Sequence, residues 1–459
     1  MLEHVPDHFE ANLQKPYAFE TRWRVASPPL RTAIDNFIDF LLSKEPPRRR
    51  ARKNHDLEKF KRAAEVICCN LLAITLAPES SRPLAVIRGH SASATSSIYG
   101  KHFNQALDLM ESLGIITYER GGKFIRKDIR APSTIMATAK IAEHLPSIED
   151  WSSLRLEEPE SVIVLKDGHG EVELDPQWFE RVKDEMSCIN TMVQSERVTF
   201  NGNVVSEKDT DSHPAVLLRT PHHRSMRRIF NGDYQSGGRL YDGFWETMPK
   251  ENRSRIHIDG QPIAVVDYGQ MHLRLAYAKA GKQPPPGDLY DFTGEDHLRD
   301  DWSALRVARK QLVSALITAK GPLRQWPGSP RERQQIRAAF PAGIKPRHAM
   351  NVIKQHHHAV AAEWFENGRN LMLHRIESDI LVTVLWRLAK LNIIALPIHD
   401  SVIVRHDLAE IAQRIMEEEA DGIPAKIERP QDSQRESPAR FLLKRVPECR
   451  RAKRLSVSP

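Results

Sequence analysis

Two apolar runs that each contain a single aspartate constrain the fold of this chain most. One reads IAVVDYG at residues 263–269, and the other reads LPIHDSVIV at residues 396–404. Runs of this length bounded by polar residues are typical of buried strands, in which a lone carboxylate is costly unless it serves a turn, a cap or a site. We therefore expect Asp267 at the end of a strand that leads into a helix, and Asp400 at the tip of a hairpin.

The meaning of these two aspartates depends on whether their strands share a sheet. Taken separately, each has an ordinary structural explanation, as a helix N-cap for Asp267 and as a turn residue for Asp400. If the strands lie side by side, the two carboxylates approach and repel each other unless a cation lies between them. Mg²⁺ prefers such oxygen ligands together with substrate phosphates, so a convergent pair predicts two-metal phosphoryl transfer.

A helix with a cationic start is expected between the two aspartates, in LRVARKQLVSALITAKG at residues 305–321. Arg306, Lys310, Ser314 and Thr318 follow one another at intervals of four, which places them on one helical face. On its own this pattern indicates a solvated basic face. Beside two acids it also fits a surface that grips the phosphates of a nucleotide.

A second amphipathic helix is expected directly before LPIHDSVIV, in HRIESDILVTVLWRLAKLNII at residues 374–394. Its apolar spacing predicts packing on a sheet. Glu377 and Asp379 near its beginning have the pattern of a solvated helix start, and an orientation toward the site is the alternative.

Together these segments resemble the A-family DNA polymerases. VVDYGQMHLRL is similar to motif A of that family, D-Y-S-Q-I-E-L-R. RVARK is similar to the start of motif B with its R-x-x-x-K, and LPIHDSVIV is similar to motif C, V-H-D-E. GGRLY at residues 237–241 is similar to the T-G-R-L-S segment upstream of motif A. The four segments keep the family order and cover roughly residues 220–420.

The resemblance implies an active site, substrates and cofactors. Primer-template DNA and nucleoside triphosphates are the expected partners, and two Mg²⁺ ions, which Mn²⁺ can replace, are the expected cofactors. The implied residues are Asp267 and Asp400 as catalytic metal ligands, Arg306 and Lys310 on the triphosphate, Tyr268 and His272 near the sugar, and Arg239 and His399 toward the nucleic acid.

The sequence also departs from the family pattern in ways that leave the product open. Ser401 replaces the usual Glu of motif C, as in the phage-type single-subunit RNA polymerases. His272 replaces the Glu that screens against a ribose 2′-hydroxyl, and Ser314 and Thr318 replace bulky residues of motif B. The expected function is that of a template-directed nucleotidyltransferase, a DNA polymerase of the A-family type. The alternatives are a non-catalytic DNA-binding replication or regulatory protein on a polymerase-like scaffold, and an RNA-making primase-like or single-subunit RNA polymerase.

The residues before these segments resemble a winged-helix DNA-binding domain, and the alternative is a winged helix that mediates protein contacts. SSIYGKHFNQALDLMESLGIITYERGGKFIRK at residues 96–127 reads as a helix ending at Gly114, followed by a hairpin that turns on Gly121 and Gly122. Lys101 and Asn104 near the start of that helix are the expected DNA contacts.

A connector is expected between the two parts. SVIVLKDGHGEVEL at residues 161–174 predicts a hairpin with its turn at DGHG. The following segment predicts a helix that is capped by Asp175 and starts with Pro176. Residues 200–225 are polar and punctuated by proline, and we expect a loop there.

The fold class expected from these patterns is α/β, of the α+β kind. It would comprise a right-hand-like polymerase palm with an antiparallel sheet and helical fingers, preceded by a helical winged-helix-like domain. The expected domains are an N-terminal helical and basic segment (1–54), the winged-helix-like domain (55–145), the connector (146–220), the polymerase-like palm and fingers (221–425), and a basic tail (426–459).

Charge and composition fit this assignment without requiring it. The chain of 459 residues has 67 basic and 60 acidic side chains, for a net charge of +7. Basic clusters at residues 46–53, 222–228 and 444–454 suit phosphate contacts or solvated surfaces. No apolar run has the length of a membrane span and no leader is evident, so we expect a cytoplasmic protein without membrane contact. The oligomeric state, and whether a replication partner completes the short fingers, stay open.

Overall fold

The computed structural model describes residues 15–47, 50, 52–88, 96–122, 124–126, 129–166, 175–202, 206–208 and 214–429. The chain forms two compact units, each built from separate stretches of sequence. Unit 1 comprises Met1–Glu160, Phe200–Ser225 and Gly243–Arg255, and unit 2 comprises Ser161–Thr199, Met226–Asp242 and Ile256–Pro459. The units interleave along the chain, whereas the domains expected from the sequence follow one another, and those domain boundaries stay predictions. Across the described ranges, no helix is both long enough and apolar enough to cross a membrane.

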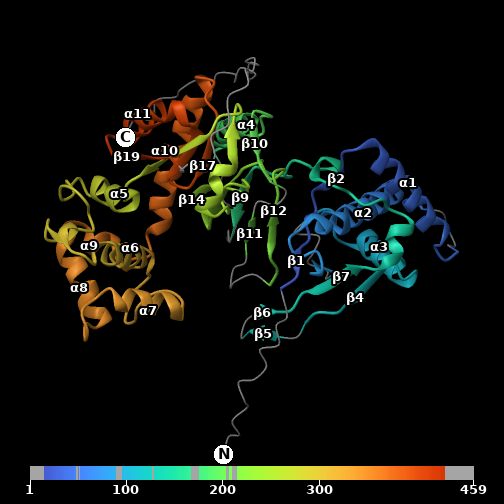
Figure 1. Cartoon of the computed structure of the whole chain (residues 1–459), viewed down its shortest axis with the longest axis horizontal. Helices are drawn as coiled ribbons and strands as arrows, with labels where there is room; N and C mark the ends of the chain where they lie inside the picture. Colours follow the sequence, from blue (N-terminus) through green and yellow to red (C-terminus); the bar gives the residue numbers. More distant parts are fainter. Residues whose placement is uncertain are drawn as a thin grey trace, which may run out of the picture. The chain divides into compact units, whose positions relative to one another are not determined.

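Unit 1 is built from three helices and a small sheet (Figure 1). The strand order is β1-β3-β7-β4, in which β7 pairs antiparallel with both β3 and β4. Apolar side chains of all three helices and the sheet form one continuous core, and Cys68 and Cys69 are free thiols inside it. The elements are α1 (Pro28–Ser43), α2 (Asn54–Ala73), α3 (Lys101–Ser112), β1 (Tyr17–Ala18), β3 (Leu84–Val86), β4 (Ile116–Glu119) and β7 (Ser133–Ala137).

The prediction of a hairpin that turns at Gly121 and Gly122 is wrong about which strands pair. β4 pairs with β7, with Ile116 opposite Ala137, while the intervening β5 (Phe124–Arg126) pairs with β6 (Ile129–Arg130). Gly121 serves a close approach of two backbones, since a Cβ built there would lie 2.3 Å from the carbonyl oxygen of Ala131. The connection between the paired strands is therefore longer than a tight turn, although the order helix, strand, helix, strand, strand is compatible with a winged helix.

Short strands complete unit 1 in stretches expected to be irregular. β2 (Trp23–Val25) pairs with β8 (Leu154–Leu156). β11 (Ser206–Lys208) pairs with β12 (Leu217–Arg219), so the polar stretch at residues 200–225 is not a simple loop.

The basic cluster at residues 222–228 is mostly internal, which corrects its interpretation as a phosphate-binding surface. His223 is buried, and its ring nitrogen Nδ1 lies 3.1 Å from the backbone nitrogen of Thr220. Burial of the His223 ring lowers its pKa to about 4, so it is neutral at physiological pH. Within unit 2, Arg228 is 1% exposed and its Nε donates to the carbonyl of Gly238 at 2.9 Å. These side chains hold structure together and do not offer charge to a ligand.

Unit 2 is centred on a four-stranded antiparallel sheet with the order β17-β18-β16-β19. The strands are β16 (Ile263–Tyr268), β17 (Ala395–Ile398), β18 (Ser401–Arg405) and β19 (Ala425–Glu428). The apolar residues of β16, β17 and β18 are buried, as the two apolar runs predict. Pro397 is tolerated because β17 is an edge strand, where a missing N–H costs no ladder bond.

A second sheet in unit 2, with the order β14-β13-β9, is joined to the first through a long helix. That helix, α10 (Asn370–Lys390), packs on β14 (Asp233–Tyr241), on β17 and on α11 (Ala409–Glu419), and α11 covers β16 and β19. β9 (Ile163–Lys166) pairs in parallel with β13 (Arg227–Asn231). The turn and second arm of the hairpin expected at residues 161–174 lie outside the described residues.

The helix expected after the connector is confirmed as α4 (Pro176–Val193). The Asp175 carboxylate accepts a hydrogen bond from the backbone N–H of Gln177 at 2.9 Å, and Pro176 occupies the first helical position. The Asp175 carboxylate satisfies one of the open N–H groups at the helix start, and Pro176 has no N–H that would need a partner. Two short strands, β10 (Val198–Phe200) and β15 (Ile256–Ile258), lie further along the chain.

Five helices of unit 2 lie between β16 and α10 in the sequence, and Figure 1 draws them in yellow to orange. His357 anchors this group, since its fully buried ring lies 3.0 Å from the Tyr277 hydroxyl and 3.1 Å from the carbonyl of Leu289. The five helices are α5 (Met271–Lys279), α6 (Trp302–Thr318), α7 (Pro330–Ala338), α8 (Pro346–His356) and α9 (His358–Trp364).

Replacing Leu396 with alanine tests whether the central sheet depends on its edge strand. Leu396 in β17 is fully buried, so Leu396→Ala should lower the free energy of unfolding by about 2–5 kcal/mol. Leu391 is 58% exposed just before the same strand, and the matched change Leu391→Ala should stay within about 0.5 kcal/mol of the parent. Urea denaturation of the three proteins measures both values, and equal effects of the two changes would contradict the burial pattern.

Candidate active site

The pairing of β16 with β18 brings the two aspartates of the apolar runs together. The register places Asp267 directly opposite Ser401, and the backbone N–H of Tyr268 donates to the carbonyl of Asp400 at 3.2 Å. Asp267 and Asp400 are therefore neighbours across two adjacent strands, although they are far apart in the sequence. Both are half-buried. The register thus places the backbones of the two aspartates side by side at one end of the sheet.

Each aspartate is placed by a turn that contains a non-glycine residue at positive φ. Gln270, at φ 63°, ends the connection from β16 to α5, and His399, at φ 51°, precedes Asp400 in the two-residue turn from β17 to β18. Residues other than glycine, asparagine and aspartate rarely adopt a positive φ, and residues held in that conformation often lie at functional sites. The ring of His399 lies edge-on to Tyr241, with 5.8 Å between ring centres.

The surroundings of Asp400 favour a cation. Burial and the nearby negative charge of Glu377 raise the pKa of the Asp400 carboxyl above its ordinary value. A bound divalent ion would offset both causes, because it stabilises the ionised carboxylate. In the part of the chain that the structure describes, no three His, Cys, Asp or Glu side chains are grouped to hold a metal ion. Two carboxylates that leave the other ligand positions to water and phosphate suit Mg²⁺.

A buried ion-pair network lies next to this acidic face. The guanidinium of Arg239 on β14 donates two hydrogen bonds to the Glu377 carboxylate on α10, at 2.7 and 2.9 Å. His272 on α5 joins them, with its Nε2 2.7 Å from Glu377. Glu377 is only 1% exposed. We call Arg239, Glu377 and His272 the buried triad.

The buried triad corrects two expectations. Arg239 was predicted to contact the nucleic acid, but its guanidinium is held by Glu377 inside unit 2. The sequence pattern places Glu377 in a solvated helix start, whereas Glu377 is buried and is the carboxylate of this network. A buried acid needs a paired cation. The one signal of this pair in the sequence was Arg239, a cation for which an acidic partner could be sought. Asp379 does lie at the surface, where it pairs with Arg228 and Arg375.

The triad holds its acid in the charged form. Burial alone would raise the pKa of the Glu377 carboxyl, but the hydrogen bond from His272 and the charge of Arg239 together lower it to about 2. The ring of His374 lies beside that of His272, with ring centres 5.0 Å apart and the ring planes tilted by 34°. Burial and the charge of Arg239 lower the pKa of His374 to about 3, so this ring stays neutral.

Tyr268 lies on the other face of the sheet from Asp267, which corrects its expected place near a sugar. Successive residues of a strand point to opposite faces. The Tyr268 side chain is buried, and its hydroxyl donates to the carbonyl of Met416 on α11. Tyr268 therefore packs the helix against the sheet and does not reach the acidic face.

The cationic face of α6 has the exposure expected of it. Lys310, Ser314 and Thr318 are exposed, and Arg306 at the same face is half-buried. Arg306 donates from Nε to Asp288 at 2.6 Å, and its guanidinium lies over the ring of Tyr290, 5.3 Å from the ring centre. The Tyr290 hydroxyl is within the electrostatic influence of both Arg306 and Asp400, which places it near α6 and near the acidic face.

The expected DNA contacts on α3 in unit 1 differ in their exposure. Lys101 at the first position of the helix is exposed. Asn104 is half-buried, and its side-chain amide donates to the carbonyl of Arg88 at 3.4 Å. Of the two, Lys101 offers its charge to solvent, while Asn104 is partly engaged within unit 1.

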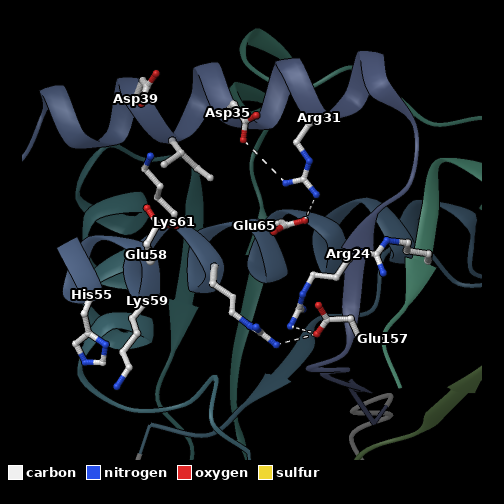
Figure 2. A pocket seen from close by; sticks show the side chains of 13 residues that line it. Arg24, Arg31, Asp35, Asp39, His55, Glu58, Lys59, Lys61, Glu65 and Glu157 are labelled. Carbon is white, nitrogen blue, oxygen red and sulfur yellow. Dashed lines mark hydrogen bonds and ion pairs between the residues drawn. The ribbon is translucent and has the colours of Figure 1, made fainter. Parts of the chain in front are cut away.

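A large charged hollow of about 810 Å³ lies between α1 and α2 of unit 1 (Figure 2). Its acids and bases are interleaved: Arg31 bonds to Glu65 at 2.6 Å, and Arg24 and Arg62 both pair with Glu157. Because the charges pair with one another, the hollow does not form the single-sign surface that a nucleic acid backbone requires.

The comparisons with known proteins name no family. No family model and no curated protein matches the chain. Among solved structures, the polymerase domain of Pol1 from M. smegmatis, in a complex with DNA primer-template and dNTP, aligns with 89% of this chain and 66% of its own length. The alignment has 10% sequence identity and a TM-score of 0.27. A score this low supports no conclusion, and the function has to be inferred from the geometry of the site.

The stability of the protein should depend on pH through Glu377. Because the folded-state pKa of Glu377 is about 2 and its ordinary value is 4.5, its ionised form stabilises the fold above pH 4.5, and this contribution is lost as the pH falls toward 2. We expect Glu377→Gln to lower the free energy of unfolding at pH 7 by on the order of 3 kcal/mol.

Urea denaturation of the parent and of Glu377→Gln from pH 7 to pH 3 measures this dependence. The difference between the two proteins should shrink as the pH falls, since a protonated Glu377 resembles glutamine. The matched control is Glu363→Gln, because Glu363 is 47% exposed in a surface ion pair with Arg369 and such pairs contribute little. A pH-independent difference for Glu377→Gln would contradict the assigned pKa.

Proposed function

We propose that this chain is a template-directed nucleotidyltransferase that extends a DNA primer by two-metal phosphoryl transfer. The observation that carries the proposal is the register of β16 and β18, which makes Asp267 and Asp400 neighbours at one end of a buried antiparallel sheet. A pair of half-buried carboxylates repels itself in the absence of a cation. The resemblance of the flanking residues to motifs A and C supports a polymerase over other metal-dependent phosphoryl transferases.

Asp267 and Asp400 would hold two Mg²⁺ ions through their carboxylates. When bound, such ions activate a primer 3′-hydroxyl and stabilise the charge that develops on the transferred phosphate and the leaving pyrophosphate. The protein's own contribution is to fix the two carboxylates on a rigid ladder, so that little reorganisation is needed during the reaction. The raised pKa of Asp400 is consistent with this role, because a cation restores its ionised form.

The start of α6 would bind the triphosphate. Arg306 and Lys310 lie one helical turn apart on the same face. Lys310 is exposed and forms no ion pair among the described residues, so its charge is available to an anionic ligand. In phosphoryl transfer such cations position the substrate and neutralise the departing charge.

The buried triad would contribute to the choice of sugar. In the resembling family, position 272 carries the Glu that screens against a ribose 2′-hydroxyl, and here it carries His272. Glu377 supplies a carboxylate 2.7 Å from that histidine, so an acid is held beside position 272 by a different element. We infer that the enzyme prefers deoxynucleotides and that the rigid pair of His272 and Glu377 limits the room for a 2′-hydroxyl.

Primer extension tests the proposal most directly. A labelled primer-template would be incubated with Mg²⁺ and either deoxy- or ribonucleotides, using the parent protein, Asp267→Ala and Asp400→Ala. Each substitution should lower the extension rate about a thousandfold or more, since it removes a ligand of the ions that stabilise the transition state. Asp407→Ala is the matched control, because Asp407 lies at the far end of β18, is 48% exposed and pairs with Arg405.

The outcomes separate the competing functions. Extension with deoxynucleotides that is lost in both site variants and kept in Asp407→Ala supports the proposal. Extension with ribonucleotides at an equal or higher rate would replace it with an RNA-making enzyme. A parent protein that binds the duplex, and extends it with neither sugar under any Mg²⁺ or Mn²⁺ condition, would favour a DNA-binding platform whose contacts include Lys101 and other basic residues of unit 1.

A further inference from the structure

A carboxylate from outside the motifs holds the cationic start of α6. Asp288 lies in the segment between α5 and α6, and its Oδ2 accepts the 2.6 Å hydrogen bond from Arg306 Nε. Its other oxygen accepts from the side-chain amide of Gln270 and from the backbone N–H of Tyr290, the latter at 2.9 Å. Asp288 thus has three donors from three parts of the chain, and its side chain is 29% exposed.

The hydrogen bond to Asp288 uses only one edge of the Arg306 guanidinium. Among the described residues, the two terminal amino groups of Arg306 have no hydrogen-bond partner. The plane of the group is supported from one side by the ring of Tyr290. A guanidinium fixed at Nε and supported on its face presents its remaining N–H groups as a fork, which is the geometry that binds a phosphate through two parallel hydrogen bonds.

We propose that Asp288 is a positioning residue that orients Arg306 to receive the triphosphate of the incoming nucleotide. This inference rests on the proposed function, and it adds a positioning residue that none of the four motif-like segments contains. Without Asp288, Arg306 would keep its charge but lose its fixed direction. A long flexible cation recovers less binding energy, because its rotamers must be ordered when the ligand binds.

The Asp288 carboxylate links Arg306 to the turn that follows Asp267 on β16. Gln270 is the residue at positive φ that ends the turn after Asp267, and its side chain bonds to Asp288 and to Arg274. Arg274 in turn donates to the carbonyls of Gly269 and Gly287. One continuous hydrogen-bond network therefore fixes the turn that carries Asp267 and the side chain of Arg306 relative to each other. Asp288 is its shared member.

A competing interpretation makes the opposite prediction. If Asp288 only neutralised Arg306, removal of its charge would strengthen the binding of an anionic nucleotide. If Asp288 orients Arg306, removal of its charge weakens that binding although the site becomes more positive. The direction of the change in nucleotide KM for Asp288→Asn therefore decides between neutralisation and positioning.

Steady-state primer extension with varied deoxynucleotide concentration would compare the parent with Asp288→Asn, Asp288→Ala and Asp288→Glu. For Asp288→Asn and Asp288→Ala we expect a nucleotide KM about tenfold higher and a kcat changed by less than about threefold, because the charge-assisted hydrogen bond acts mainly in binding. For Asp288→Glu we expect the KM to return part of the way to the parent value. Asp291→Asn is the matched control, since Asp291 lies in the same segment but accepts hydrogen bonds from Gly294, Asp296 and His297. Thermal unfolding of each variant checks that the segment stays folded.

A second measurement separates failure of this inference from failure of the proposed function. Calorimetric binding of inorganic tripolyphosphate needs no catalysis, and we expect it to be weakened about tenfold by Arg306→Ala and by Asp288→Asn, but not by Asp291→Asn. If the parent extends primers and Asp288→Asn leaves KM unchanged or lowers it, the positioning role is overturned while the polymerase stands. If the parent extends nothing, the polymerase fails, and equal tripolyphosphate binding by the parent and Asp288→Asn would overturn the role of Asp288 as well.

Discussion

The antiparallel pairing of β16 with β18 is the constraint on which the rest of unit 2 depends. It joins two apolar strands from distant parts of the chain and fixes the register in which Asp267 lies opposite Ser401. Consecutive residues of β16 and of β18 are buried, so both faces of this ladder are covered, and the register decides which residues of the two strands lie opposite each other.

The two acids near this ladder, Glu377 and Asp400, differ in how far their negative charge is compensated. Glu377 is fully compensated, since Arg239 and His272 both bond to it and its pKa falls to about 2. Asp400, which is close enough to Glu377 to be affected by its charge, has a raised pKa. Of these two neighbouring acids, Glu377 is thus held in its charged form, whereas the charged form of Asp400 is disfavoured by burial and by Glu377.

Local patterns in the sequence predicted the elements, and long-range contacts decided the roles. A strand ending at Asp267, a hairpin tip at Asp400, the exposed face of α6 and the Asp175 cap all follow from patterns within about twenty residues. The bonds of Arg239 to Glu377 and of Arg306 to Asp288 do not, because each joins elements whose approach is set by packing. The pairing of β4 with β7 is likewise set by packing and not by local sequence. The side of the strand on which Tyr268 lies is set by α11, which covers that side and accepts the hydrogen bond from the Tyr268 hydroxyl.

The turn after Asp267 is where these contacts meet. Gln270 adopts its uncommon backbone conformation there, begins α5 and bonds to Asp288, which holds Arg306. Further along α5, Tyr277 bonds to His357, which also reaches the carbonyl of Leu289 next to Asp288. The loop that carries Asp288 is thus bonded near both ends of α5, to Gln270 and, through His357, to Tyr277. Under the proposed function, α5 would connect the turn after Asp267 to the loop of Asp288, which holds Arg306.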